Sequence, residues 1–119
     1  MSEKKLYALR GAVKCNNTIE DICCKVSLLY ENILEKNRLS ESDIVSVIFS
    51  QTGDLNAINP ATALRRSGRA GNTALFAVME ADTVNSPCGI IRVLIHCYLP
   101  CGSKPCHVYC NGAEVLREK

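Results

Sequence analysis

The segment NNTIEDICCKVSLLYENILEKN, residues 16–37, constrains the fold more than any other part of this 119-residue chain. Thr18 is suited to cap a helix, with Asp21 three residues later in a capping-box-like start. An apolar stripe of this length has to be buried against another apolar surface, which the rest of the chain must supply. The stripe follows from apolar side chains that recur every three or four residues, namely Ile19, Ile22, Cys23, Val26, Leu29, Tyr30 and Ile33.

The segments outside this helix are mostly rich in β-branched residues, which is typical of strands. Between two of them, NPATALRRSG predicts a short helix with Asn59 as its cap, Pro60 in its first position and Gly68 as its terminator. We therefore predict a single domain, residues 1–119, of the mixed α/β (α+β) class, in which two helices cover one face of a mixed β-sheet. The predicted strands span residues 5–13, 44–50, 73–80 and 90–99, and shorter strand-like pieces follow at 107–110 and 114–117.

Two charged residues lie within or at the end of apolar strands. Arg92 interrupts IIRVLI, and Glu80 ends ALFAVME. An isolated buried charge is costly, so each residue requires a partner or a ligand. The connection ADTVNSPCG predicts a hairpin centred on Ser86, which would place Glu80 opposite Arg92. A structural salt bridge between these two strands is the simplest explanation of the pair by itself.

Charge and hydropathy exclude several classes of function. A net charge of +2, without a basic run or interleaved aromatic residues, does not favour nucleic-acid binding. The longest apolar stretch, residues 90–99, is interrupted by Arg92 and His96, so we expect no membrane span. The N-terminal residues MSEKKLYALRG lack the apolar core of a secretory signal, which predicts a cytoplasmic protein.

Eight cysteines, four of them in HCYLPCGSKPCHVYC (residues 96–110), suggest a thiolate metal site or a disulfide framework. A cytoplasmic location argues against disulfides. In an extended chain Cys106 and Cys110 would be roughly 13 Å apart, too far to share one zinc ion. The paired C-x-x-C spacing of zinc knuckles is absent as well. We therefore expect free or buried thiols and no metal site.

Several motifs follow one another in a particular order: LRGAV, DLNAINPATALRRSG, VMEAD, GIIRVLIH and HVYCNGAEVLR. From about Leu6 to Arg117, this order and its intervals resemble the monofunctional chorismate mutase family of the small trimeric type, best known from bacilli. RGA is a weak signal alone. The combination of RGA, D-L-x-A-x-x-P-A-x-A-x-R, E-x-D and I-R-V in this order is fairly specific.

The resemblance implies an isomerase of aromatic amino-acid biosynthesis that rearranges chorismate to prephenate, an intramolecular Claisen reaction without cofactor, metal or covalent intermediate. It also implies a homotrimer with a pseudo-barrel core and active sites between adjacent subunits. By motif position, Arg92 would donate to the breaking ether oxygen, and Glu80 would accept from the substrate hydroxyl. The implied substrate-binding residues are Arg10, Arg65, Phe76, Ala77, Tyr109, Leu116 and Arg117.

The implied roles fit the chemistry of the substrate, a dianion whose transition state gathers negative charge on the departing oxygen. Fixed guanidinium donors suit that charge and bind carboxylates through two parallel hydrogen bonds. The chain departs from the family pattern at Asn59, Thr62 and Ala77, where the pattern has an aromatic residue, a lysine and a cysteine. Three alternatives remain open: an imine deaminase of similar trimeric architecture, a non-catalytic module for small anions, and a thiolate metal protein.

Overall fold

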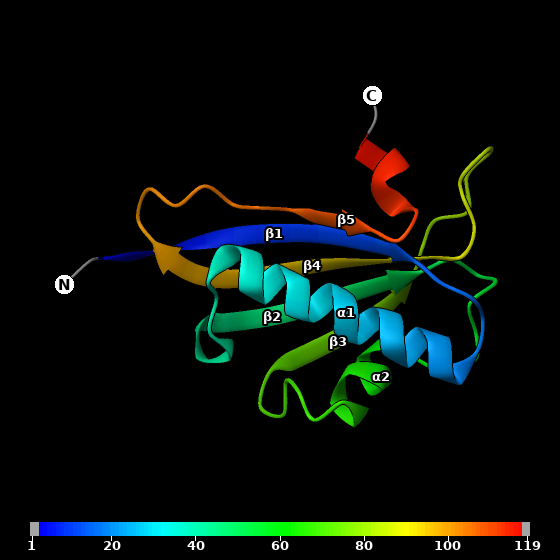
Figure 1. Ribbon diagram of the computed structural model, residues 1–119, viewed down its shortest axis with the longest axis horizontal. Helices are drawn as coiled ribbons and strands as arrows, with labels where there is room; N and C mark the ends of the chain where they lie inside the picture. The colour runs from blue at the N-terminus through cyan, green and yellow to red at the C-terminus, as the bar shows by residue number, and fades with distance from the viewer. Residues whose placement is uncertain (1–2, 118–119) are drawn as a thin grey trace.

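The computed structural model describes residues 3–117 and shows one mixed sheet with the strand order β3-β2-β4-β1-β5 (Figure 1). The central strand β4 runs antiparallel to both β1 and β2, whereas β3 is parallel to β2 and β5 is parallel to β1. The bounds are Lys4–Lys14 for β1, Ile44–Gln51 for β2, Ala74–Met79 for β3, Ile90–Pro100 for β4 and Val108–Cys110 for β5.

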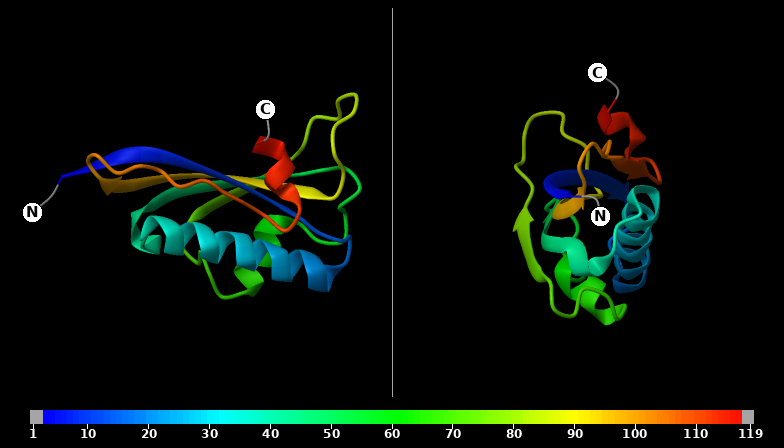
Figure 2. Two further views of the ribbon diagram at one scale, coloured as in Figure 1. Left: turned by 45° about the horizontal axis from the view of Figure 1, so that its top comes forward. Right: turned by 90° about the vertical axis from the view of Figure 1, so that its left-hand side faces the viewer.

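Both helices lie on the same face of this sheet and contact each other there (Figure 2). The first helix, α1, spans Ile19–Asn37, and the second, α2, spans Pro60–Arg66. The Thr18 hydroxyl accepts a hydrogen bond from the backbone N–H of Asp21 at 3.0 Å, and Asn59 caps α2 in the same way. Gly68, with φ of +86°, follows α2 in the left-handed conformation that ends many helices. The predicted helices, their caps and the mixed α/β class are confirmed.

The predicted hairpin between β3 and β4 is wrong, because β2 lies between them. Parallel neighbours such as β2 and β3 need a long crossover, which α2 supplies, and this leaves β3 at the edge of the sheet. Strand β4 then pairs with the other side of β2, where Ser50 lies opposite Arg92. Residues 80–89 therefore connect strands on either side of β2, and Glu80 is not a cross-strand neighbour of Arg92.

The strand predicted at residues 114–117 is also wrong, because these residues belong to the 3-10 helix η2, Ala113–Arg117. Asn111 and Gly112 form the predicted turn, and both have positive φ, +52° and +94°. The turn directs the chain away from β5 and onto the face opposite the two helices (Figure 2). There Leu116 packs against a small cluster that contains Ala12 and Ile90.

The two faces of the sheet differ sharply in burial. Side chains that point toward the helices, such as Phe49 and Ile95, are fully buried. On the opposite side, which we call the open face, large apolar side chains remain exposed, including Phe76 at 64% and Tyr98 at 44%. An exposed apolar surface of this kind indicates an interaction site. By strand alternation the open face comprises Leu6, Ala8 and Arg10 of β1, Ser46, Ile48 and Ser50 of β2, Phe76 and Val78 of β3, and Arg92, Leu94, His96 and Tyr98 of β4.

Gly11 lies where β1, β5 and α1 approach one another most closely. A Cβ atom at this position would be 2.8 Å from the carbonyl oxygen of Val108 and 2.9 Å from Cδ1 of Ile33. We therefore expect Gly11→Ala to lower the free energy of unfolding by about 1–3 kcal/mol, because the backbone of β5 has to shift. Urea denaturation measures this difference. Gly53→Ala is the matched control, because a Cβ there meets no atom within 4 Å, and equal effects in both variants would contradict the expectation.

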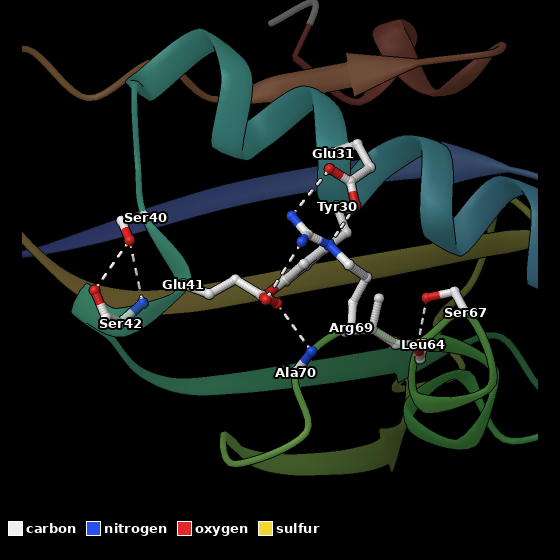
Figure 3. A network of polar contacts seen from close by, with 9 residues as sticks. All are labelled: Tyr30, Glu31, Ser40, Glu41, Ser42, Leu64, Ser67, Arg69 and Ala70. Atoms are coloured by element: carbon white, nitrogen blue, oxygen red, sulfur yellow. Dashed lines mark hydrogen bonds and ion pairs between the residues drawn. The ribbon is translucent and has the colours of Figure 1, made fainter.

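A polar network ties α1 to the segment that enters β3 (Figure 3). Glu41, in the 3-10 helix η1 (Glu41–Asp43), accepts hydrogen bonds from the Tyr30 hydroxyl at 2.6 Å and from the backbone N–H of Ala70 at 2.9 Å. Nη1 of Arg69 lies 3.4 Å from the same carboxylate, and its Nε lies 2.6 Å from Oε2 of Glu31. The network joins α1 and η1, which are neighbours in the sequence, to the segment at Ala70, which lies 29 positions after Glu41.

This network predicts a loss of stability in acid. Burial raises the pKa of Glu41, but hydrogen bonds from Tyr30 and Ala70 and the charge of Arg69 outweigh burial and lower it below its ordinary value of 4.5. The ionised Glu41 carboxylate therefore contributes to the free energy of unfolding above pH 4.5, and this contribution is lost as the pH falls through the pKa of Glu41 in the folded protein. We expect Glu41→Gln to be less stable than the parent protein near neutral pH, and the two to converge in acid. Urea denaturation across the pH range measures this. The exposed Glu35→Gln should follow the parent curve, and a constant gap between Glu41→Gln and the parent would contradict the prediction.

Candidate active site

A pocket of about 230 Å³ opens on the face of the sheet away from the helices. Its floor is apolar, and two arginines reach it from neighbouring strands of the sheet. We call it the arginine pocket. It is lined by Arg10 and Gly11 of β1, Ile48 and Ser50 of β2, Arg92, Val93 and Leu94 of β4, and Tyr109 of β5.

Arg92 occupies the part of β4 that lies between β1 and β2, paired with Ala12 on one side and Ser50 on the other. Its side chain is 43% exposed, and its Nε lies 3.5 Å from Oε1 of Glu80. That Nε is shielded from solvent, yet it makes no hydrogen bond to any residue that the structure describes. The guanidinium is therefore oriented by a nearby carboxylate that does not occupy all of its hydrogen-bond donors. It can still donate a hydrogen bond to a ligand.

Glu80 follows β3 directly and is held from β2. Its backbone N–H donates to the carbonyl oxygen of Gln51 at 2.8 Å, and its Oε1 accepts from the Ser50 hydroxyl at 2.5 Å. The predicted proximity of Glu80 to Arg92 thus arises through β2. Ser50 is a site residue that sequence reasoning missed, although the two serines of IVSVIFS, at positions 46 and 50, are four residues apart and therefore share one face of the strand.

Other predicted residues lie around the same pocket. Arg10 is exposed, and its backbone N–H donates to Nδ1 of His107 at 3.0 Å. Tyr109 is half-buried, and Leu116 packs with it against the cluster beneath η2. Arg117 is the last residue of η2, and the prediction for its side chain lies outside what the structure describes.

The remaining predicted residues do not reach the arginine pocket. Arg65, Phe76 and Ala77 line a second hollow of about 330 Å³ between α2 and β3, which we call the α2–β3 pocket. Asn59 and Thr62, the two departures from the family pattern on this side, line it as well. One guanidinium nitrogen of Arg65 donates to the carbonyl oxygen of Thr73 at 3.1 Å. A single chain therefore carries the predicted site residues in two separate groups.

The cysteines lie apart from both pockets. All eight thiols are free, and within residues 3–117 no three His, Cys, Asp or Glu side chains are grouped so that they could hold a metal ion. Burial, assisted by Asp21, raises the pKa of the Cys15 thiol to about 11, and burial also raises the pKa of Cys97. These two residues serve as apolar core side chains. No helix in the described part of the chain has the length and hydropathy needed to cross a membrane.

The chain is similar to known proteins in both sequence and fold. Residues 6–119 match the family described as chorismate mutase type I. The chain is 31% identical over 114 residues to chorismate mutase AroH from Bacillus subtilis (strain 168), covering 94% of this chain and 90% of that protein. The structure of a chorismate mutase from Clostridium thermocellum aligns with a TM-score of 0.84 at 40% identity, covering 92% of this chain and 98% of that one. The resemblance seen in the sequence is confirmed: this chain belongs to the chorismate mutase type I family.

Proposed function

We propose that the arginine pocket is where this enzyme rearranges chorismate to prephenate, and that a homotrimer completes it. The observation that carries the proposal is that the Arg92 guanidinium has hydrogen-bond donors that no described residue uses. Its shielded Nε lies 3.5 Å from Oε1 of Glu80, and the pocket that it lines has an apolar floor. A cation held in this way, with hydrogen-bond donors still available, suits a reaction that generates negative charge.

The reaction needs no nucleophile and no proton transfer. Within one molecule, the ether C–O bond breaks while a new C–C bond forms, and the departing oxygen gains negative charge until it becomes a ketone oxygen. In the proposed mechanism Arg92 donates a hydrogen bond to that oxygen and stabilises the transition state more than the bound substrate. Holding chorismate in the compact conformer that brings the two carbons together supplies the rest of the acceleration.

The neighbouring residues orient the substrate in this mechanism. Glu80 accepts a hydrogen bond from the substrate hydroxyl, and Ser50 holds the Glu80 carboxylate in place from β2. Arg10 binds a substrate carboxylate, and Tyr109 donates a further hydrogen bond from the other side of the arginine pocket. In the proposed mechanism the C-terminal segment that contains Leu116 and Arg117 closes over the bound substrate.

Three features of the chain support a trimeric arrangement. The arginine pocket, at about 230 Å³, is smaller than most pockets for small molecules, which hold about 300–1,000 Å³. The open face exposes Leu6, Phe76 and Tyr98, which a second copy would bury. Arg65, Phe76 and Ala77 lie at the edge of the sheet formed by β3, which is the edge opposite β5. In a closed ring, the α2–β3 pocket of one subunit meets the arginine pocket of the next.

A chorismate assay on the purified protein, combined with its mass in solution, tests the proposal. We expect chorismate absorbance to disappear far faster than without protein, and a mass of three 13.0 kDa chains. Chorismate binding without turnover would make the chain an anion-binding module. Full activity in a monomer would contradict the sites between subunits. The predicted cytoplasmic location stays a prediction.

A further inference from the structure

His107 lies directly before β5 and makes a contact that strand pairing does not supply. The parallel ladder between β1 and β5 begins at Gly11 and Val108. One residue earlier on each strand, the backbone N–H of Arg10 donates to Nδ1 of His107 at 3.0 Å. The imidazole thus takes the place of a strand carbonyl, and a nitrogen that accepts in this way carries no proton.

The position of His107 is set by α1. Asn37, the last residue of α1, accepts from the backbone N–H of Cys106 at 2.8 Å and donates from Nδ2 to the carbonyl oxygen of the same residue at 2.8 Å. The amide Nδ2 also donates to the carbonyl oxygen of Ile33 at 2.9 Å. Because one amide pairs with both backbone groups of Cys106, the residue before His107 is tied to a rigid helix.

We propose that His107 is a positioning residue for Arg10. The Arg10 side chain is exposed and lines the arginine pocket, so its direction depends on how well its backbone is held. On one side β1 pairs with β4 along its whole length, but on the other side β5 pairs with only three of its residues. His107 extends that short ladder to the residue whose guanidinium has to meet a carboxylate.

This inference rests on the proposed role of Arg10 in substrate binding. A carboxylate is present in the substrate as well as in the transition state, so a displaced Arg10 weakens both states. Loss of such uniform binding raises KM while kcat changes little. A residue that served only the overall stability of the fold would not produce this separation of KM from kcat.

Two variants replace the imidazole with an amide oxygen as acceptor, at two different distances from the backbone. The side-chain oxygen of asparagine can occupy the place of Nδ1, whereas the oxygen of glutamine reaches the place of Nε2. We expect His107→Asn to stay within about threefold of the parent kcat/KM, and His107→Gln to raise KM about tenfold, the cost of about one hydrogen bond. Steady-state kinetics with chorismate measure both variants, and equal KM values for the two would overturn the proposal.

A double-mutant cycle with Arg10→Ala shows whether His107 acts through Arg10. If it does, adding His107→Gln to Arg10→Ala changes KM by less than about twofold. A tenfold rise in both backgrounds would overturn the proposal, because His107 would then act independently of Arg10. If Arg10→Ala alone leaves KM and kcat unchanged, the proposed role of Arg10 fails, and this inference fails with it. Should His107→Gln not fold, His107→Ala replaces it in the double-mutant cycle with Arg10→Ala, with the same expected outcomes.

Discussion

Replacing Arg92 with lysine is expected to preserve the fold and the proposed trimer while lowering kcat by about 10²- to 10³-fold, the usual effect of removing one fixed donor to a developing oxyanion. Lysine keeps the positive charge but has no counterpart of the shielded Nε that lies 3.5 Å from Glu80. Its ammonium is a compact, mobile charge, whereas the guanidinium presents donors in a fixed plane. Steady-state kinetics with chorismate measure kcat, the mass in solution measures the assembly, and thermal unfolding shows whether the fold is preserved.

Arg66→Lys is the matched control for this variant, because Arg66 is exposed at the end of α2 and lines neither pocket. We expect its kcat to equal that of the parent protein. Near-normal turnover in Arg92→Lys would remove Arg92 from its proposed role. Loss of turnover with loss of the trimer would indicate that the substitution acts on assembly.

Mixing two inactive variants is expected to restore activity. Arg92→Ala disables the arginine pocket, and Arg65→Glu places a negative charge in the α2–β3 pocket, where it repels the dianionic substrate. Each variant alone should have very low kcat/KM. If every site takes one pocket from each of two neighbouring subunits, both pockets are intact at about one quarter of the sites in a random 1:1 mixture and at about one third of the sites in its mixed trimers. Co-expression with two different tags, followed by purification of the mixed trimers, makes the measurement possible.

A second mixture controls for nonspecific recovery. Nε of Arg92 lies 3.5 Å from Oε1 of Glu80 in the same chain, so Arg92→Ala and Glu80→Gln damage the same half of the proposed site. This mixture should recover no activity beyond that of its separate members. Absence of recovery in verified mixed trimers of Arg92→Ala and Arg65→Glu would contradict the proposed sites between subunits.

Local features of the fold could be predicted because they depend on residues close together in the chain. The helical spacing of residues 19–33, the Thr18 cap and the Asn59–Pro60 start of α2 each act within a few residues. Arg92 stood out for a similar reason, because a charge in the middle of IIRVLI has no local partner. The motif order then indicated the family before any contact was known.

The strand order could not be derived in this way, because it depends on which distant segments pair. The turn residues around Ser86 suggested a hairpin, but the crossover through α2 inserted β2 between β3 and β4. Residues 114–117 were predicted as a strand-like piece, but the turn at Asn111 and Gly112 carries them out of the sheet into the 3-10 helix η2.

The sequence by itself determined the two helices with their caps, the longer strands, the family and the charged residues that require a partner or a ligand, because steric preferences and desolvation act on each segment wherever it lies. Only the tertiary structure decided that Ser50 holds Glu80, that His107 accepts a hydrogen bond from the Arg10 backbone and that most of the predicted substrate-binding residues divide between two pockets. These contacts join residues at least 30 positions apart. Their geometry is set by the packing of the whole sheet, which no local pattern encodes.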